Sequence, residues 1–198
     1  MYTAFSIWYI ACRAVDSMGT KTLISCDEFE RIAHDLGPCE LIDGEIVQLA
    51  PGGFDHSFSS SKIDRILGGF VEDNELGWVL GNEAGVRIRE DLPRSRGADF
   101  LFISYKRIPK GKRPKGFLRI APELIVEVLD DDGSWEKMHK KVDDYHEIGV
   151  DMVWVADPNT RTVKTFPLRG KPSIIHDGEQ IDGGRFLPGF KVPIARFF

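Results

Sequence analysis

The stretch Ala121–Gly149 reads APELIVEVLDDDGSWEKMHKKVDDYHEIG. Its first part is a continuous apolar run, which is typical of a strand buried on both faces of a sheet. Pro122 suits the first residue of such a strand, where its missing N–H removes no ladder hydrogen bond. Glu127 lies inside the apolar run, and a buried carboxylate is costly unless it is paired or binds a metal. This residue is therefore either a structural ion-pair partner or part of a chemical site.

A helix is predicted after the Asp-rich turn, because apolar residues recur there at helical spacing. They are Trp135, Met138, Val142, Tyr145 and Ile148. Gly149 suits the position just after the helix, and the apolar run 152–156 predicts the next strand. A strand, a helix and a strand imply a right-handed parallel crossover with the helix lying across the sheet. Lys141 falls at the edge of the apolar stripe, so it either approaches Glu127 or extends past the stripe into solvent.

Length and composition indicate one globular domain. The chain has 198 residues and 42% hydrophobic content, which is enough for a sizeable core. A charged fraction of 29% with scattered Gly and Pro argues against long disorder. We expect residues 1–20 to be a disordered extension or the product of a non-native translation start, and residues 21–198 to form the domain. The apolar segment 4–12 is too short to span a membrane and lacks the basic region of a signal peptide.

Charge is unevenly distributed along the chain. The formal net charge is -5, yet residues 106–119 hold seven basic residues and no acidic one, so the remainder carries -12. That segment either neutralises nucleic-acid phosphates or is a solvated loop. The three cysteines, Cys12, Cys26 and Cys39, form no CxxC pair and no zinc spacing. Their odd number suits a reducing, cytoplasmic setting.

Local signals predict the remaining elements. Ser25–Glu28 is a capping-box pattern that opens a short helix, and Gly37–Pro38 ends it. Asp43–Gly44 joins two short strands in a hairpin, and a second helix begins at His56 and ends near Asn74. Further strands are predicted at 78–80, 86–89, 98–103, 162–166 and 173–176, of which the last two form an antiparallel flank. The whole is a mixed α/β or α+β domain.

Asp99 is a second acid in apolar surroundings, at the head of a predicted strand and 28 positions before Glu127. Two strand-borne carboxylates near a helix-borne lysine suit a hard cation such as Mg²⁺ or Mn²⁺. Such a metal polarises a phosphoryl oxygen and supplies a nucleophilic water, while Lys141 stabilises the negative charge that develops. The chain contains no GxSxG, HExxH, P-loop or GxGxxG motif, which excludes the common hydrolase, zinc-protease and nucleotide-binding classes.

Several motifs together resemble the Uma-two family, which groups restriction-endonuclease-like proteins within the PD-(D/E)xK nuclease superfamily. They are Glu40–Glu45, Pro51 followed by His56, Ala98–Asp99, Pro122–Leu129, Lys141 with Tyr145 and Gly149, and Trp154–Pro158. The resemblance runs from about Asp27 to about Phe166. It implies a restriction-endonuclease-like core: a mixed β-sheet flanked by helices, with an N-terminal hairpin and C-terminal antiparallel strands. It also implies Mg²⁺-dependent hydrolysis of DNA phosphodiester bonds.

The resemblance assigns roles to individual residues. Asp99 matches the family's first metal-binding acid and Glu127 its second. Lys141 matches a catalytic lysine that has moved to the helix, because the usual position, two residues after Glu127, is Leu129. Glu40 matches an additional N-terminal acid.

Other positions leave alternatives open. Glu45 is the substitute for Glu40, and Asp130–Asp132, in place of a serine-containing turn, either binds a second cation or caps the helix. His56 is either a helix-terminus histidine or a substrate contact. The candidate contacts in the basic segment are Lys112, Arg113 and Lys115. We expect DNA as partner, a homodimer and no membrane. The alternatives are an inactive nuclease-fold binding or assembly module and a hydrolase of another phosphoester.

Overall fold

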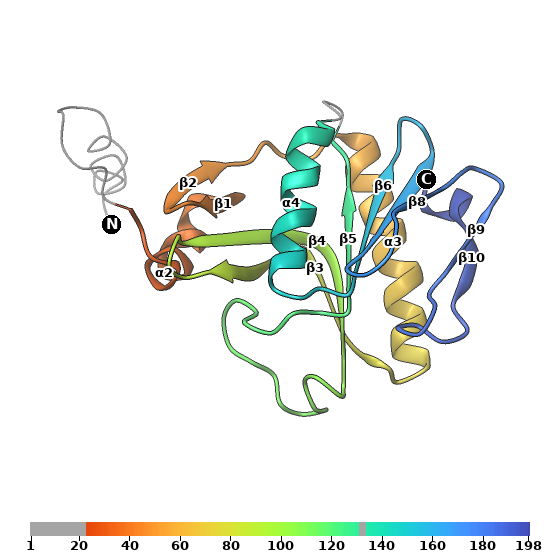
Figure 1. Ribbon diagram of the computed structural model, residues 1–198, viewed down its shortest axis with the longest axis horizontal. Helices are drawn as coiled ribbons and strands as arrows, with labels where there is room; N and C mark the ends of the chain where they lie inside the picture. The colour runs from red at the N-terminus through yellow and green to blue at the C-terminus, as the bar shows by residue number, and fades with distance from the viewer. Residues whose placement is uncertain (1–22, 131–133) are drawn as a thin grey trace, which may run out of the picture.

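The computed structural model describes residues 23–130 and 134–198 (Figure 1). Its large sheet has the order β2-β1-β4-β5-β6-β7-β8, and β3 pairs with β4 off this path. The strands are β1 (Cys39–Ile42), β2 (Glu45–Gln48), β3 (Gly77–Arg89), β4 (Arg94–Ser104), β5 (Leu124–Val128), β6 (Met152–Asp157), β7 (Thr162–Pro167) and β8 (Ser173–Ile175). The helices are α2 (Cys26–Leu36), α3 (Phe54–Asp73) and α4 (Trp135–Glu147). The predicted mixed sheet flanked by helices is confirmed.

The predicted crossover from β5 through α4 to β6 is present. The two strands are parallel, with Leu124 opposite Met152 at one end of the ladder. The Ser134 hydroxyl caps α4 by accepting the backbone N–H of Lys137, and Gly149 follows the helix with a φ of 89°, in the region that favours glycine. Pro122 precedes the strand by two residues instead of opening it.

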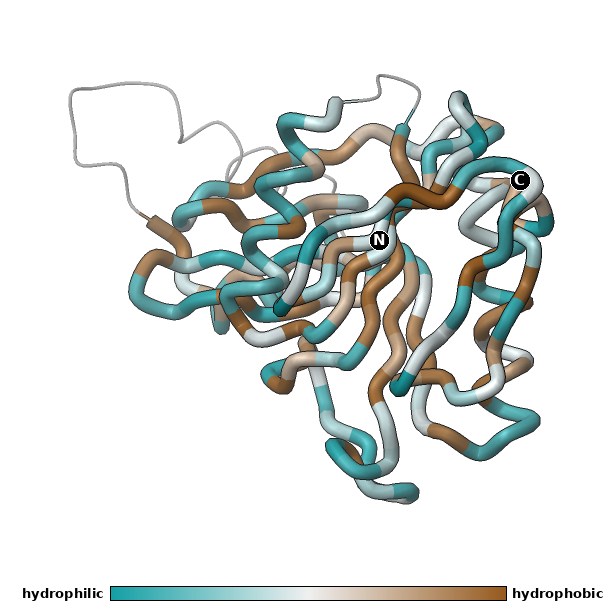
Figure 2. Tube along the Cα trace, turned by 45° about the vertical axis from the view of Figure 1, so that its right-hand side comes forward, coloured by the Kyte–Doolittle hydropathy of each residue, from teal (hydrophilic) through white to brown (hydrophobic). Residues whose placement is uncertain are grey.

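Two apolar layers enclose the sheet. Successive residues of a strand point to opposite faces, so Val126 and Val128 pack towards α3, while Ile125 packs towards α4. Figure 1 shows α4 in front of β4 and beside β5, with α3 behind the sheet. In Figure 2 the central strands are largely brown and the projecting loops largely teal. Glu127 therefore belongs to the α4 face of an otherwise apolar strand.

A C-terminal unit that the sequence pattern did not reveal covers the α3 side. It consists of β9 (Gln180–Asp182), β10 (Lys191–Pro193) and the 3₁₀ helix η2 (Ile194–Phe197). Its buried side chains join the α3 core, namely Ile181, Leu187, Phe190, Ile194 and Phe197. Strands of three residues are too short for a clear alternation of apolar and polar residues, which explains why the pattern gave no signal.

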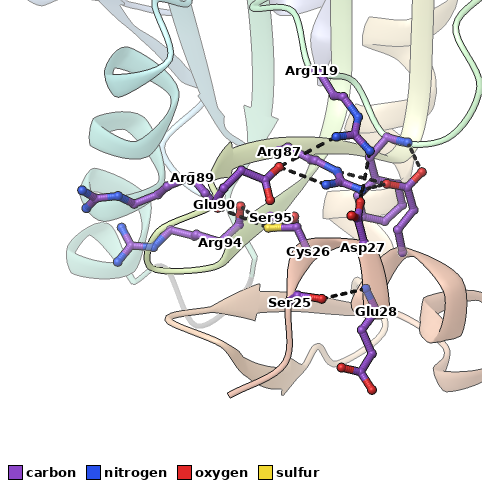
Figure 3. Close-up of polar contacts among 12 residues, drawn as sticks. Ser25, Cys26, Asp27, Glu28, Arg87, Arg89, Glu90, Arg94, Ser95 and Arg119 are labelled. Atoms are coloured by element: carbon purple, nitrogen blue, oxygen red, sulfur yellow. Dashed lines mark hydrogen bonds and ion pairs between the residues drawn. The ribbon is translucent and has the colours of Figure 1, made fainter. Parts of the chain in front are cut away.

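A buried arginine fastens α2 to β3. The side chain of Arg87 is only 5% exposed, and its guanidinium lies 2.6 Å from Asp27 and 2.9 Å from Glu90. Figure 3 shows it between these carboxylates, with Arg119 beside them. The predicted cap is also present, because the Ser25 hydroxyl accepts the backbone N–H of Glu28. This cluster fixes the N-terminal helix to the sheet.

Some expectations fall on residues that are not described. The predicted extension, residues 1–20, the apolar segment 4–12 and Cys12 all lie outside the described ranges. Cys26 and Cys39 are free thiols. Within residues 23–130 and 134–198, no helix combines the length and apolar character needed to cross a membrane.

Gly69→Ala is expected to stabilise the protein by about 0.5–1 kcal/mol, because glycine in a helix interior loses more backbone entropy on folding than alanine does. A Cβ at position 69 of α3 meets no atom within 4 Å. Urea unfolding at 25 °C measures the change. The matched control is Gly77→Ala, whose Cβ would stand 2.3 Å from the carbonyl oxygen of Ile103 and which should destabilise. A destabilised Gly69→Ala variant would contradict the open space beside the helix.

Candidate active site

The sheet register brings the two predicted metal-binding acids together. β3 runs along one edge of β4, so β1 and β5 share the other edge. Phe100 pairs with Val126, and the next step along this antiparallel ladder places Asp99 opposite Glu127. At the end of this ladder, the Asp99 side chain takes the place of a backbone acceptor, since its Oδ2 accepts a hydrogen bond from the backbone N–H of Val128 at 2.8 Å. Both carboxylates therefore stand at the point where β4 and β5 separate.

Helix α4 supplies the predicted lysine. Lys141 Nζ lies 2.8 Å from Glu127 Oε2 and 3.5 Å from Glu40 Oε1. One turn further along, the Tyr145 hydroxyl lies 2.6 Å from Glu127 Oε1 and 3.0 Å from the carbonyl of Gly97. The Glu127 side chain is 1% exposed, so its negative charge depends on these two partners.

Glu40 also reaches the site, but an arginine holds it. Its Oε2 accepts a hydrogen bond from Arg96 at 2.6 Å, and its Oε1 accepts the N–H of Gly97 at 3.2 Å. The guanidinium of Arg96 binds Asp144 on α4 as well, at 2.6 Å. The substitute candidate, Glu45, is exposed on β2. Glu40 is thus a member of a structural ion-pair network as well as a neighbour of Lys141.

His56, near the start of α3, contacts two acids of the site. Its Nε2 lies 3.4 Å from Asp99 Oδ1, and its Nδ1 lies 3.2 Å from Asp130 Oδ1. The Nδ1–H is not aligned for a hydrogen bond, so the second contact is electrostatic. The contact with Asp99 raises the pKa of His56 to about 9 in spite of its burial. Burial favours a raised pKa for Asp99, but His56 and Lys141 outweigh it and lower that pKa.

His56→Gln is expected to reveal this charge as a pH-dependent loss of stability. A group whose pKa is higher in the folded chain than the ordinary 6.5 stabilises the fold when protonated, so its contribution is complete below pH 6.5 and disappears as the pH rises through about 9. Urea unfolding in EDTA between pH 6 and 10 should give a difference of about 1.5–3 kcal/mol at pH 6. That difference should shrink at alkaline pH. A constant difference across the range would mean that His56 is neutral.

A further acid, Glu83, reaches the site from β3, and the sequence reasoning missed it. Gly81 pairs with Phe100 and Ala84 with Ala98, so Asn82 and Glu83 together form a bulge opposite Asp99. Glu83 is exposed to the cleft, but the protein atoms that surround its carboxylate keep water away and raise its pKa; Lys141 partly offsets this, and Asp99 and Glu40 raise the pKa further. The available signal was the pair of glycines, Gly81 and Gly85, on either side of Asn82 and Glu83. Such glycines mark a bulge within one strand as readily as a break between two strands.

The acids of the site influence one another's protonation. Burial raises the pKa of Glu127 to about 8; Lys141 works against this, while Asp99 and Glu83 add to it. The same acids, with Glu40, raise the pKa of Lys141 above its ordinary value although burial works in the opposite direction. With a pKa of about 8, Glu127 is mostly protonated at neutral pH, and a bound cation would favour its charged form.

The predicted contacts in the basic segment lie elsewhere. Lys112, Arg113 and Lys115 belong to the loop after β4, and none lines the cleft that holds Asp99 and Glu127. Ser104, where that loop begins, is five residues beyond Asp99, or about 16 Å along the strand. Arg113 lies over the ring of Trp78, 5.0 Å from its centre. The structure therefore does not bring this segment to the acids; Figure 1 shows the loop projecting at the opposite end of the sheet.

The cleft has a volume of about 770 Å³. In the described part of the chain, no three acidic, histidine or cysteine side chains are close enough to form a ready-made metal cage. Asp99 and Glu127 nevertheless suit Mg²⁺, which needs only one or two protein carboxylates and keeps several waters. Each of their four oxygens has one protein partner and retains a second lone pair. The donor set therefore fits a hard divalent cation.

A solved structure shares this arrangement of sheet and helices. It is the crystal structure of a "putative nuclease belonging to DUF820" from Anabaena variabilis ATCC 29413, with a TM-score of 0.74 and 21% sequence identity. The match covers 88% of this chain and 97% of that one. At this identity the likeness establishes the fold. No curated protein matches the chain.

The sequence itself establishes the family. The Uma2 family model, described as "Putative restriction endonuclease", matches residues 26–195. The chain therefore belongs to the Uma2 family. The match extends beyond Phe166, where the resemblance in the sequence motifs ends, and includes β9, β10 and the first two residues of η2.

Proposed function

We propose that the protein is a Mg²⁺-dependent endonuclease that hydrolyses DNA phosphodiester bonds in the cleft above β4 and β5. The observation that supports this most directly is the pairing of two carboxylates, Asp99 and Glu127, at one level of the sheet with Lys141 2.8 Å from Glu127. Neither acid is neutralised by an arginine in the described ranges. Membership of a nuclease family is consistent with phosphodiester chemistry.

Each residue would have a separate task. Asp99 and Glu127 would hold the cation, for which Mn²⁺ is the usual experimental substitute. When bound, the metal supplies a polarised phosphoryl oxygen and a water of lowered pKa. Lys141 would place its ammonium beside the scissile phosphate and stabilise the charge that develops on it. His56 would orient Asp99 through their contact, and Glu40 would orient Lys141.

Cleavage of plasmid DNA tests this proposal. The wild type should nick supercoiled plasmid in Mg²⁺ but not in EDTA, and Asp99→Ala or Glu127→Ala should abolish the activity. Asp177→Ala, which removes an exposed acid paired with Arg161, is the matched control and should cleave normally. Activity that survives both site substitutions would refute the assignment. Cleavage of small phosphodiesters without cleavage of DNA would favour the other phosphoester class.

Two further expectations accompany the proposal. An inactive binding or assembly module would keep the fold without binding divalent cations, and calorimetric titration with Mn²⁺ distinguishes it from the nuclease. Restriction-type nucleases act on two strands, so we also propose a homodimer, which sedimentation equilibrium would detect as twice the mass of 22.3 kDa.

A further inference from the structure

The bulge in β3 is built in an uncommon conformation. Both of its residues have left-handed backbones, with φ of 59° at Asn82 and 58° at Glu83. Asparagine tolerates this region, whereas a longer side chain such as that of glutamate occupies it rarely. Bulges next to active sites re-aim a side chain, and such backbone outliers cluster at functional positions. The conformation turns Glu83 towards the level of Asp99.

The Glu83 carboxylate lies where a side chain on β4 is missing. A Cβ at Gly97 would stand only 2.2 Å from Glu83 Oε2, so the glycine creates the space that the carboxylate fills. Gly97 also donates its N–H to Glu40 and lies beside the Tyr145 hydroxyl that contacts Glu127. Glu83 is therefore held close to the other acids of the cleft.

Glu83 and Glu40 differ in their partners. The oxygens of Glu40 are occupied by Arg96, the Gly97 N–H and Lys141, and its side chain is 5% exposed. Glu83 is exposed to the cleft. Its carboxylate forms no hydrogen bond or ion pair with any residue in the described ranges 23–130 and 134–198. A carboxylate that already has an arginine partner attracts a cation much less than one without such a partner.

We propose that Glu83, and not Glu40, is the third carboxylate that supports the divalent cation at Asp99 and Glu127, through its charge beside these two ligands. This inference rests on the proposed function, since it concerns the same cation. Glu40 instead fixes α4 through Arg96 and Lys141.

Calorimetric titration with Mn²⁺ in the absence of DNA tests the proposal. Glu83→Gln keeps the shape of the side chain and should weaken Mn²⁺ affinity about tenfold, as expected for a group that supports metal ligands. Gly97→Ala should weaken it in the same direction, because the new Cβ displaces the Glu83 carboxylate while leaving Asp99 and Glu127 unchanged. Glu40→Gln and Gly69→Ala should bind Mn²⁺ within about threefold of the wild type. Thermal unfolding in EDTA checks that each variant is folded.

The outcomes separate this inference from the function on which it rests. Weakened binding by Glu83→Gln and Gly97→Ala, with near-normal binding by Glu40→Gln, supports it. Wild-type affinity in Glu83→Gln, or a larger loss of affinity in Glu40→Gln than in Glu83→Gln, overturns the inference. The proposed metal site still stands in that case if Glu127→Gln loses Mn²⁺ binding. A wild-type protein that binds no Mn²⁺ overturns both.

Discussion

Lys141→Met is expected to lower the rate of Mg²⁺-dependent DNA cleavage by about 10²–10³-fold, the usual effect of removing one group that stabilises transition-state charge. Methionine keeps the length of the side chain and removes its charge. The Lys141 side chain is 15% exposed and its ammonium lies 2.8 Å from Glu127, so a cation from the solvent does not replace it easily. Single-turnover cleavage of plasmid DNA at saturating Mg²⁺ measures the effect.

The control for Lys141→Met is its neighbour on the same helix. Lys140→Met removes an equal charge, but that ammonium is 68% exposed and pairs with Glu136 on the solvent side, so cleavage should change only a few-fold. Calorimetry should show that Lys141→Met still binds Mn²⁺, because the variant removes a positive charge beside the ligands. Normal cleavage by Lys141→Met would exclude this lysine from the reaction. If Lys141→Met does not bind Mn²⁺, its loss of cleavage would be due to disruption of the metal site.

The strand-helix-strand unit was predictable because its signals are local and agree with each other. The residues on both sides of Glu127 form a continuous apolar run, whereas a half-buried strand alternates apolar and polar residues. The apolar stripe on the following helix fixes which face of that helix meets the sheet. A parallel connection then has one favoured hand. Those three facts allowed Lys141 either to approach Glu127 or to extend past the stripe into solvent, and in the structure it contacts Glu127.

Glu83 was not predictable by the same reasoning. The residues 81–85 interrupt the apolar pattern, which therefore predicts separate strands at 78–80 and 86–89. In the structure they are one strand, Gly77–Arg89, because β4 pairs with both halves and absorbs the interruption as a bulge. Only the long-range register with β4 decides between these two interpretations. A pattern read along one chain segment does not contain that register.

The network that holds Glu40 was hidden for a related reason. Leu41 pairs with Ser95, which sets Glu40 beside Arg96, and Arg96 reaches Asp144 on a helix that follows in the chain 48 residues later. The strand was predicted to begin at Ala98, so its arginines were not considered as part of the sheet. The distribution of charge along the sequence instead indicated the basic loop as the place of substrate contacts, but the side chains of that loop do not line the cleft.

Arg96→Met is expected to destabilise the protein by about 3–5 kcal/mol, the usual cost of removing one partner of a buried ion-pair network. Glu40 and Asp144 have side chains 5% and 4% exposed and both bind this guanidinium. Without it, Asp144 keeps Arg94 and Glu40 keeps Lys141 and the N–H of Gly97, but each buried carboxylate loses one charged partner. Urea unfolding in EDTA measures the loss.

Two companion variants define the cause of that loss. Arg161→Met breaks an ion pair whose partners are 44% and 47% exposed, so it should change stability by less than about 0.5 kcal/mol. Arg96→Met combined with Glu40→Gln removes one of the stranded charges and should lose less than the sum of the two single changes. Additive losses would mean that Glu40 is solvated or bound elsewhere once Arg96 is gone. In that case Glu40, whose Oε1 lies 3.5 Å from Lys141 Nζ, would again be a candidate to approach a cation.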